Sequence, residues 1–116
     1  MFKVIIAGGR DFQDYDTLCR ICDFMLQNKS EVEVVCGMAR GADLLGKKYA
    51  LERGLKVAEF PADWESHGKK AGPIRNKQMA EYANALIAFW DGKSSGTANM
   101  ISLARKMELP LKVHNY

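Results

Sequence analysis

The hydrophobic positions of the chain follow two patterns that alternate along the sequence. Short runs rich in Val, Ile, Leu and Ala are each followed by a longer segment in which apolar residues recur every three or four positions. The first pattern is typical of buried strands, and the second is typical of amphipathic helices. The short runs predict five strands, at residues 3–7, 32–36, 55–60, 84–90 and 111–115.

The longer segments predict four helices, at residues 14–28, 42–54, 73–83 and 94–109. Gly54 is suited to ending the second helix, and Pro73 is suited to the first turn of the third. Strands that are separated by helices pair in parallel, and right-handed crossovers place the helices on both faces of the sheet. We therefore predict a single Rossmann-like α/β domain over residues 1–116, with three layers and a five-stranded parallel sheet in the order 3-2-1-4-5.

Composition fits one globular domain, because 47% of the 116 residues are hydrophobic and 27% are charged. No apolar run approaches the roughly 20 residues that span a bilayer, and the first residues lack the pattern of a secretion signal. We expect a cytoplasmic protein with no membrane contact. The net charge of +3 permits contact with phosphates but is small for a dedicated nucleic-acid binder.

The three cysteines are expected to be reduced, because they cannot all pair within one chain. Cys19 and Cys22 form a C-x-x-C pair, but they lie well inside the first predicted helix, where packing is the simpler role. Cys36, His67 and His114 lack the paired spacing of a zinc site. We therefore expect no metal and no cofactor.

A sheet of this order binds ligands outside the carboxyl ends of its strands, close to the point where the winding reverses. That point lies between the first and fourth strands. Three loops rich in glycine and in polar or charged residues are expected to meet there, at residues 8–12, 36–45 and 91–97.

These loops have the composition of a phosphate-binding site. Glycine allows the backbone to approach a ligand, and free amides at a helix start attract anions. The predicted ligand-binding residues of the loops are Gly8, Gly9, Arg10, Asp11, Gly37, Arg40, Gly41, Asp43, Ser94, Ser95, Gly96 and Thr97. None of the loops matches the G-x-G-x-x-G or G-x-x-x-x-G-K-[ST] fingerprint. The alternative for each single loop is that its glycines only turn the chain and that Asp43 only caps its helix.

The segment between the third strand and the third helix is predicted to be a long loop, of the kind that often serves as a lid or a binding loop. Trp64 is suited either to stacking on a nucleobase or to anchoring the loop on the core. Arg75 and Asn76, near the predicted helix start, are expected to point into the site. His67, Lys69 and Lys70 are expected to surround a phosphate or, for the two lysines, to remain solvated.

Four stretches of the sequence carry a family resemblance: "GGRDF", "GMARGAD", "PADWESHGKKAGPIRNKQM" and "DGKSSGTANM". Together they resemble the YspA-related branch of the SLOG superfamily, a group of small Rossmann-like proteins of bacteria and phages. The resemblance covers most of the chain and implies that these loops bind a nucleotide or a nucleotide-derived ligand. It also implies that a homodimer is a plausible assembly, although no dimer seam is visible in the sequence.

Two more distant likenesses imply alternative functions. The order "ARGAD", "GPIRN", "SSGT" is similar to the DNA-processing protein Smf/DprA, which implies binding of single-stranded nucleic acid. The glycine–threonine loop resembles the LOG phosphoribohydrolases, which implies cleavage of an N-glycosidic bond. In those enzymes a glutamate follows the glycine–threonine pair by three residues, whereas this chain has Met100, which cannot act as an acid or a base.

The sequence therefore leaves open whether the chain is an enzyme. A catalytic carboxylate would have to come from Asp11, Asp43 or Asp91, one in each of the three predicted loops. We favour a binding or sensing module for a small phosphate-bearing ligand, ahead of a nucleotide-processing enzyme and a nucleic-acid binder.

Overall fold

The computed structural model of the chain describes residues 1–116 and contains one parallel sheet in the order β3-β2-β1-β4-β5. This confirms the predicted fold class and strand order. The strands are β1 (Phe2–Gly8), β2 (Val32–Cys36), β3 (Lys56–Glu59), β4 (Ala85–Trp90) and β5 (Leu111–Asn115). The helices are α1 (Tyr15–Leu26), α2 (Ala42–Glu52), α3 (Trp64–His67), α4 (Ala71–Tyr82), α5 (Ser95–Lys106) and the 3₁₀ helix η1 (Gly68–Lys70).

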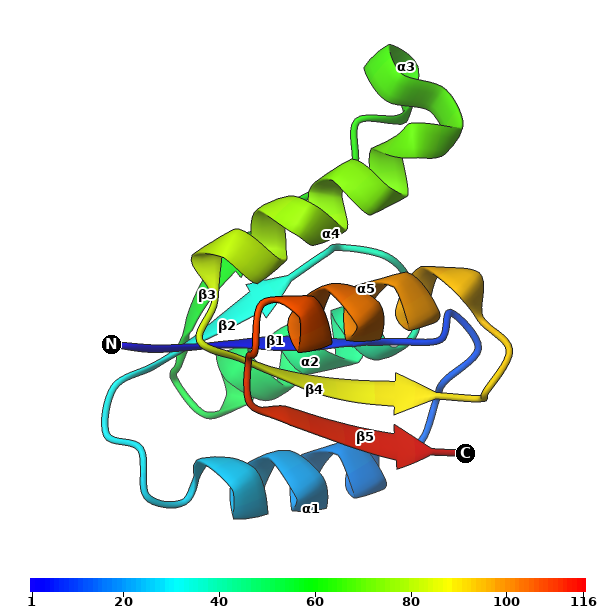
Figure 1. Cartoon of the computed structure of the whole chain (residues 1–116). Helices are drawn as coiled ribbons and strands as arrows, with labels where there is room; N and C mark the ends of the chain where they lie inside the picture. The colour runs from blue at the N-terminus through cyan, green and yellow to red at the C-terminus, as the bar shows by residue number, and fades with distance from the viewer.

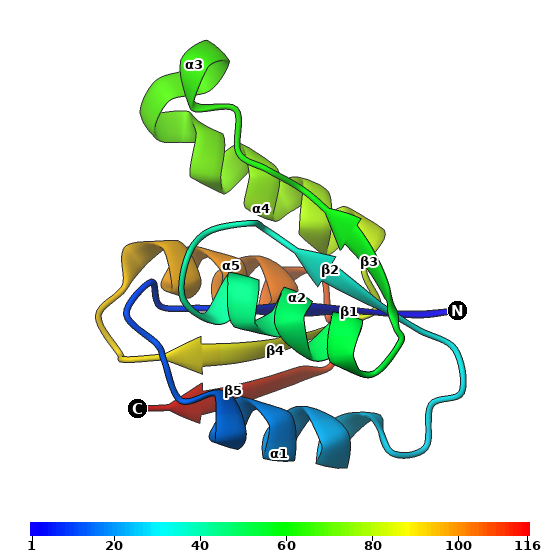
Figure 2. The ribbon, with the colours of Figure 1, turned by 180° about the vertical axis from the view of Figure 1, so that it is seen from behind.

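Helices cover both faces of the sheet (Figures 1 and 2). Successive residues of the central strand β1 point to opposite faces, so Val4 and Ile6 pack with α1 and α2 while Ile5 and Ala7 pack with α4 and α5. Burial on both sides explains why β1 and β4 are nearly continuous apolar runs rather than alternating ones. The carboxyl ends of these two strands meet at one edge of the sheet.

The segment after β3 differs from its prediction. In place of a long loop, residues 64–70 form α3 and η1, and α4 begins at Ala71, two residues before Pro73. The Asp63 carboxylate caps α3 by accepting from the Ser66 amide at 3.2 Å. No residue of α3 or η1 is buried, so the sequence carried no apolar period to reveal them. Figure 1 shows α3 projecting beyond the body of the domain, above the first turns of α4.

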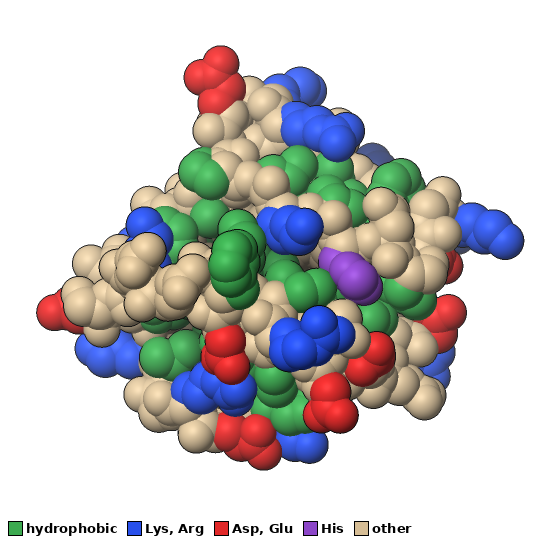
Figure 3. All heavy atoms as spheres, turned by 90° about the horizontal axis from the view of Figure 1, so that it is seen from below, with side chains coloured by type: hydrophobic (Ala, Val, Ile, Leu, Met, Phe, Trp, Pro, Cys, Tyr) green, Lys and Arg blue, Asp and Glu red, His purple; other side chains and the backbone are tan.

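Charges of both signs are interspersed on the surface seen from below in Figure 3, where no large patch of a single sign is visible. None of the helices is both long enough and apolar enough to cross a bilayer.

Candidate functional site

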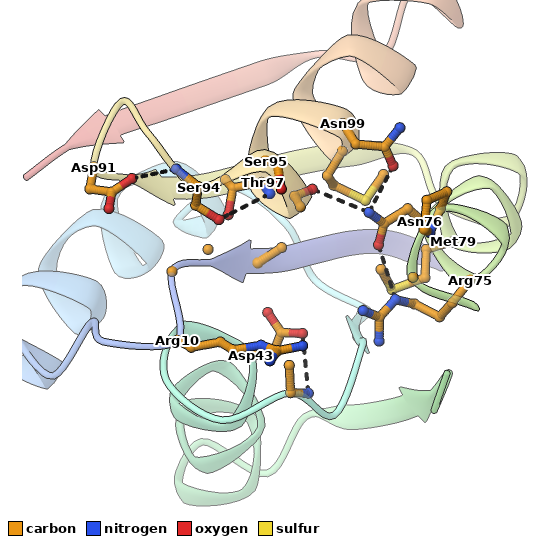
Figure 4. A pocket seen from close by; sticks show the side chains of 18 of the residues that line it. Arg10, Asp43, Arg75, Asn76, Met79, Asp91, Ser94, Ser95, Thr97 and Asn99 are labelled. Carbon is orange, nitrogen blue, oxygen red and sulfur yellow. Dashed lines mark hydrogen bonds between the residues drawn. The ribbon is translucent and has the colours of Figure 1, made fainter. Parts of the chain in front are cut away.

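A cavity of about 660 Å³ opens at the carboxyl edge of the sheet, beside the ends of β1 and β4 (Figure 4). Its volume falls within the range of small-molecule sites. The structure brings twelve of the predicted ligand-binding residues to its wall: Gly8, Gly9, Arg10, Asp11, Asp43, Trp64, Arg75, Asn76, Ser94, Ser95, Gly96 and Thr97. Asp91, the remaining candidate for catalysis, also lines it.

We call the cavity of about 660 Å³ the main cavity. The start of α5 lies on its wall and has backbone amides without an acceptor. Ser94 caps the helix, with its side chain accepting from the Thr97 amide. The Asp91 carboxylate accepts from the Lys93 and Ser94 amides at 2.8 Å, which fixes the turn before the helix. The amides of Ser95 and Gly96 have no acceptor within the chain. They are therefore available to an anion, whose charge the helix dipole favours.

The space beside the Gly96 backbone is empty. A Cβ atom built on it would meet nothing within 4 Å, and its φ angle is not in the left-handed region. The absence of a side chain at this position is therefore not required by the fold. It leaves room for a ligand to approach the backbone.

The start of α2 differs from the start of α5, because its first amide already has an acceptor within the protein. The Ala42 amide donates to the Gly9 carbonyl oxygen at 3.1 Å. Gly41 has a φ angle of 82°, and a Cβ atom there would overlap the backbone of Gly9 and Arg10. Gly41 therefore joins the loop after β2 to the loop after β1, and it does not line the main cavity.

Asp43, in the first turn of α2, is a buried carboxyl with 5% of its surface exposed. It accepts from the Ala39 amide at 3.3 Å and lies on the same side of the cavity as Arg10, facing Arg75 (Figure 4). Burial raises the pKa of Asp43 to about 6, against the opposing effects of Arg75, of two backbone amides and of Arg10. The group is thus able to exchange a proton close to neutral pH.

The other two candidate carboxyls are engaged by protein groups. The amides of Ser94 and Lys93 lower the pKa of Asp91, which holds it ionised as part of the turn. Asp11 is exposed and accepts from the Tyr116 hydroxyl at 2.6 Å.

Arg75 and Asn76 of α4 connect three parts of the site. The Arg75 guanidinium donates to the carbonyl oxygen of Gly37, and its Nε donates to Asn76 Oδ1 at 3.0 Å. Asn76 Nδ2 in turn donates to Asn99 Oδ1 at 3.0 Å and to the Gly96 carbonyl oxygen at 3.3 Å. Both side chains are buried, so this network fixes α4 against the end of β2 and the start of α5.

A second, smaller space adjoins the main cavity, and we call it the side cavity. Its volume is about 180 Å³. The predicted residues Gly37 and Arg40 line this space and not the main one, which corrects their expected position. The remaining lining residues are Arg10, Met38, Ala39, Pro61, Ala62, Trp64 and Arg75.

Trp64 lies between the two spaces and lines both, with 50% of its surface exposed. Its ring lies against Gly72 of α4, where a Cβ atom would be 3.4 Å from Cη2. One part of the Trp64 ring therefore packs on α4, and the other part is exposed to the two cavities. Lys69 lines the main cavity, whereas His67 and Lys70 line neither space, contrary to their expected place around a phosphate.

Sequence reasoning missed seven residues of the main cavity wall, among them Met79, Asn99 and Met100. A signal existed for two of them. Asn99 follows Ser95 by four residues and Met79 follows Arg75 by four, so each pair shares one face of its helix. Met100 was interpreted as a core residue of its helix and as the residue that replaces a catalytic glutamate.

The fold and the position of this cavity define the class of protein: a Rossmann-like domain whose candidate site is formed by loops at the carboxyl edge of a parallel sheet. The chain belongs to the YspA, cpYpsA-related SLOG family, whose model matches residues 2–67. It is also 36% identical to the Gene 61 protein of Mycobacterium phage D29, over 96% of this chain and 94% of that protein.

Two solved structures share the fold at low sequence identity. DNA processing protein A from Streptococcus pneumoniae has a TM-score of 0.80 at 16% identity, and the match covers 97% of this chain and 50% of that one. DNA processing protein A from Helicobacter pylori, a structure concerned with its single-stranded DNA binding mode, has a TM-score of 0.71 at 20% identity. That match covers 97% of this chain and 64% of the other, so the chain spans only part of the length of both proteins.

Proposed function

We propose that the main cavity binds a nucleotide or a nucleotide-derived ligand through its phosphate, and that the protein acts as a binding or sensing module. The observation that carries the proposal is the pair of unused amides at Ser95 and Gly96, two residues that line the main cavity. Both residues are exposed, so an incoming ligand can reach their amides, and an anionic oxygen is the partner that a helix start favours.

Two cations of the cavity are free to support the same anion. The ion pairs of the chain join Lys47 to Glu59 and Arg53 to Asp23, so Arg10 and Lys69 have no carboxylate within 4.0 Å. Both side chains line the main cavity. A charge-assisted hydrogen bond from either one to a phosphate is stronger than one between neutral groups.

The remaining wall suits the other parts of a nucleotide. The half-exposed ring of Trp64 offers a surface for a base, and stacking of this kind tolerates any base. The amide group of Asn99 and the hydroxyl groups of Ser94 and Ser95 offer donors and acceptors for a ribose. The resemblance described under Sequence analysis implies a ligand of the same class.

Replacement of Gly96 by alanine tests the proposal, because it separates binding from folding. Gly96 is the second residue of α5, and its Cβ space is empty, so Gly96→Ala should stabilise the fold by up to about 1 kcal/mol. The added methyl group occupies the approach to the two amides. We therefore expect this more stable variant to lose roughly tenfold or more in affinity for its ligand.

The measurement is a thermal-shift screen of nucleotides, ribose phosphates and dinucleotides, followed by calorimetric titration of each hit. A ligand that binds only the native state raises the melting temperature with its concentration. Ser102→Ala is the matched control, since it also favours α5 but replaces an exposed residue outside the cavity. Equal affinities for Gly96→Ala and Ser102→Ala would contradict the assignment of the phosphate to the α5 amides.

The two alternative functions have separate readouts. Single-stranded DNA binding, the subject of the Helicobacter pylori relative, predicts affinity for oligonucleotides that falls steeply as salt rises. Cleavage of an N-glycosidic bond predicts release of free base, and Asp43 is the carboxyl with the pKa best suited to it. Release of base that is lost in Asp43→Asn while the ligand still binds would favour the enzyme over the binding module.

A further inference from the structure

The side cavity differs from the main cavity in its charge. Three arginines line it, Arg10, Arg40 and Arg75, and no acidic residue does. The main cavity has three basic and three acidic residues on its wall: Arg10, Lys69 and Arg75 against Asp11, Asp43 and Asp91. The smaller space is therefore the more strongly positive of the two. Its volume of about 180 Å³ is large enough for a phosphate group and several waters.

Arg40 has no role in the fold that explains its place there. It is exposed, it belongs to neither ion pair of the chain, and it makes no hydrogen bond within the protein. Arg75 is the opposite, because its guanidinium is buried and already donates to Gly37, Phe60 and Asn76. Arg40 is thus the cation of the side cavity with the most unused donors.

The two spaces adjoin each other. They share Arg10, Ala39, Trp64 and Arg75, so one ligand that extends past these residues would contact both. Ser95, at the start of α5, lies across the main cavity from Arg10 and Asp43 (Figure 4), whereas Arg40 lines only the side cavity. A ligand that contacts both the α5 amides and Arg40 must therefore cross the main cavity.

We propose that the side cavity binds a second phosphate of the same ligand, so that the site selects a nucleoside flanked by two phosphates over a mononucleotide. This inference rests on the proposed function. In the arrangement it describes, one phosphate contacts the α5 amides, the nucleoside fills the main cavity beside Trp64, and the second phosphate contacts Arg40. Adjacent phosphates, as in ADP, do not reach both ends.

The test compares four probes by calorimetric titration: AMP, ADP, adenosine 3′,5′-bisphosphate and the dinucleotide pApA. We expect the bisphosphate and the dinucleotide to bind roughly tenfold or more tightly than AMP, as one additional charge-assisted contact implies. The ranking of these two probes distinguishes a free bisphosphate from a strand end as the source of the second phosphate. ADP is expected to gain less than either.

The variant Arg40→Gln identifies where the second phosphate lies. It should bring the ratio of AMP to bisphosphate dissociation constants close to one. Arg105→Gln is the matched control, because it removes the same charge from an exposed position in the last turn of α5 and should keep the wild-type ratio.

The outcomes separate the two proposals. Binding of AMP with no gain for the bisphosphate or the dinucleotide overturns the side-cavity assignment and leaves the proposed function standing. An equal gain for ADP, or a ratio that Arg40→Gln leaves intact, also overturns the assignment. Failure of all four probes to bind at millimolar concentration overturns both.

Discussion

The ionisation of Asp43 sets two effects of similar size against each other. Burial favours the neutral carboxyl, whereas Arg75, Arg10 and the backbone amides favour the carboxylate. The balance leaves the pKa near 6, above the ordinary value of 3.8. A shift of this size corresponds to about 3 kcal/mol of stability that depends on pH.

The sign follows from which state holds the proton more tightly. The folded protein binds it more tightly than the unfolded chain, because the folded pKa is the higher one. The stabilising contribution is therefore fully present below about pH 3.8 and is lost as the pH rises through 6. Asp43→Asn removes this dependence, since an amide does not titrate in this range.

Urea unfolding of the wild type and of Asp43→Asn between pH 4 and pH 7.5 measures the effect. We expect the free energy of unfolding of the wild type to fall by roughly 2–3 kcal/mol relative to the variant across this range. Other groups cancel in the difference if they titrate alike in both proteins. A difference that stays constant would refute the reasoning, because it would show that Arg75 and Arg10 cancel the effect of burial on the pKa. A difference that changes in the opposite direction would show that they outweigh it.

Two further predictions concern residues that hold the loops in place, both measured by urea unfolding. Gly41→Ala should lower the free energy of unfolding by about 3 kcal/mol or more, because the new side chain overlaps neighbouring backbone at a positive φ. Gly54 also has a positive φ but lies in open space, so Gly54→Ala should lower it by only about 1 kcal/mol. Equal losses for Gly41→Ala and Gly54→Ala would show that backbone strain, and not the overlap with neighbouring atoms, sets the loss of stability. Asn76→Ala should cost about 1–3 kcal/mol, since it leaves the Arg75 Nε without its acceptor, whereas Asn99→Ala should cost less than about 1 kcal/mol. The reverse order would contradict the role given to the buried network.

The fold was predictable because the sequence repeats one simple pattern. Five apolar runs separated by helical periods fix a parallel sheet, and the crossover rule leaves few possible strand orders. The helices α3 and η1 were not predicted, because none of their residues is buried and the sequence there has no apolar period. Their start depends on one cap at Asp63, a signal too short to recognise without a following apolar period.

The candidate site was predictable at the level of loops but not of individual contacts. Parallel strands bring their carboxyl ends together, so residues such as Gly8 and Gly96 had to meet at one edge. Which side of a loop each residue faces depends on backbone angles that composition does not reveal. Met38, at a φ angle of 64°, lies in the turn that leaves Gly37 and Arg40 in the side cavity rather than the main one.

The contact between Gly41 and the backbone of Gly9 and Arg10 has a consequence for comparing and engineering members of this family. The loops after β1 and β2 behave as one interlocked unit, since the first occupies the space that a side chain at Gly41 would need and its Gly9 carbonyl oxygen accepts from the Ala42 amide. Transplanting either loop alone from a homologue should fail wherever the donor differs at the point of contact. Ligand preference in this fold is therefore expected to be exchanged by grafting the two loops as a pair.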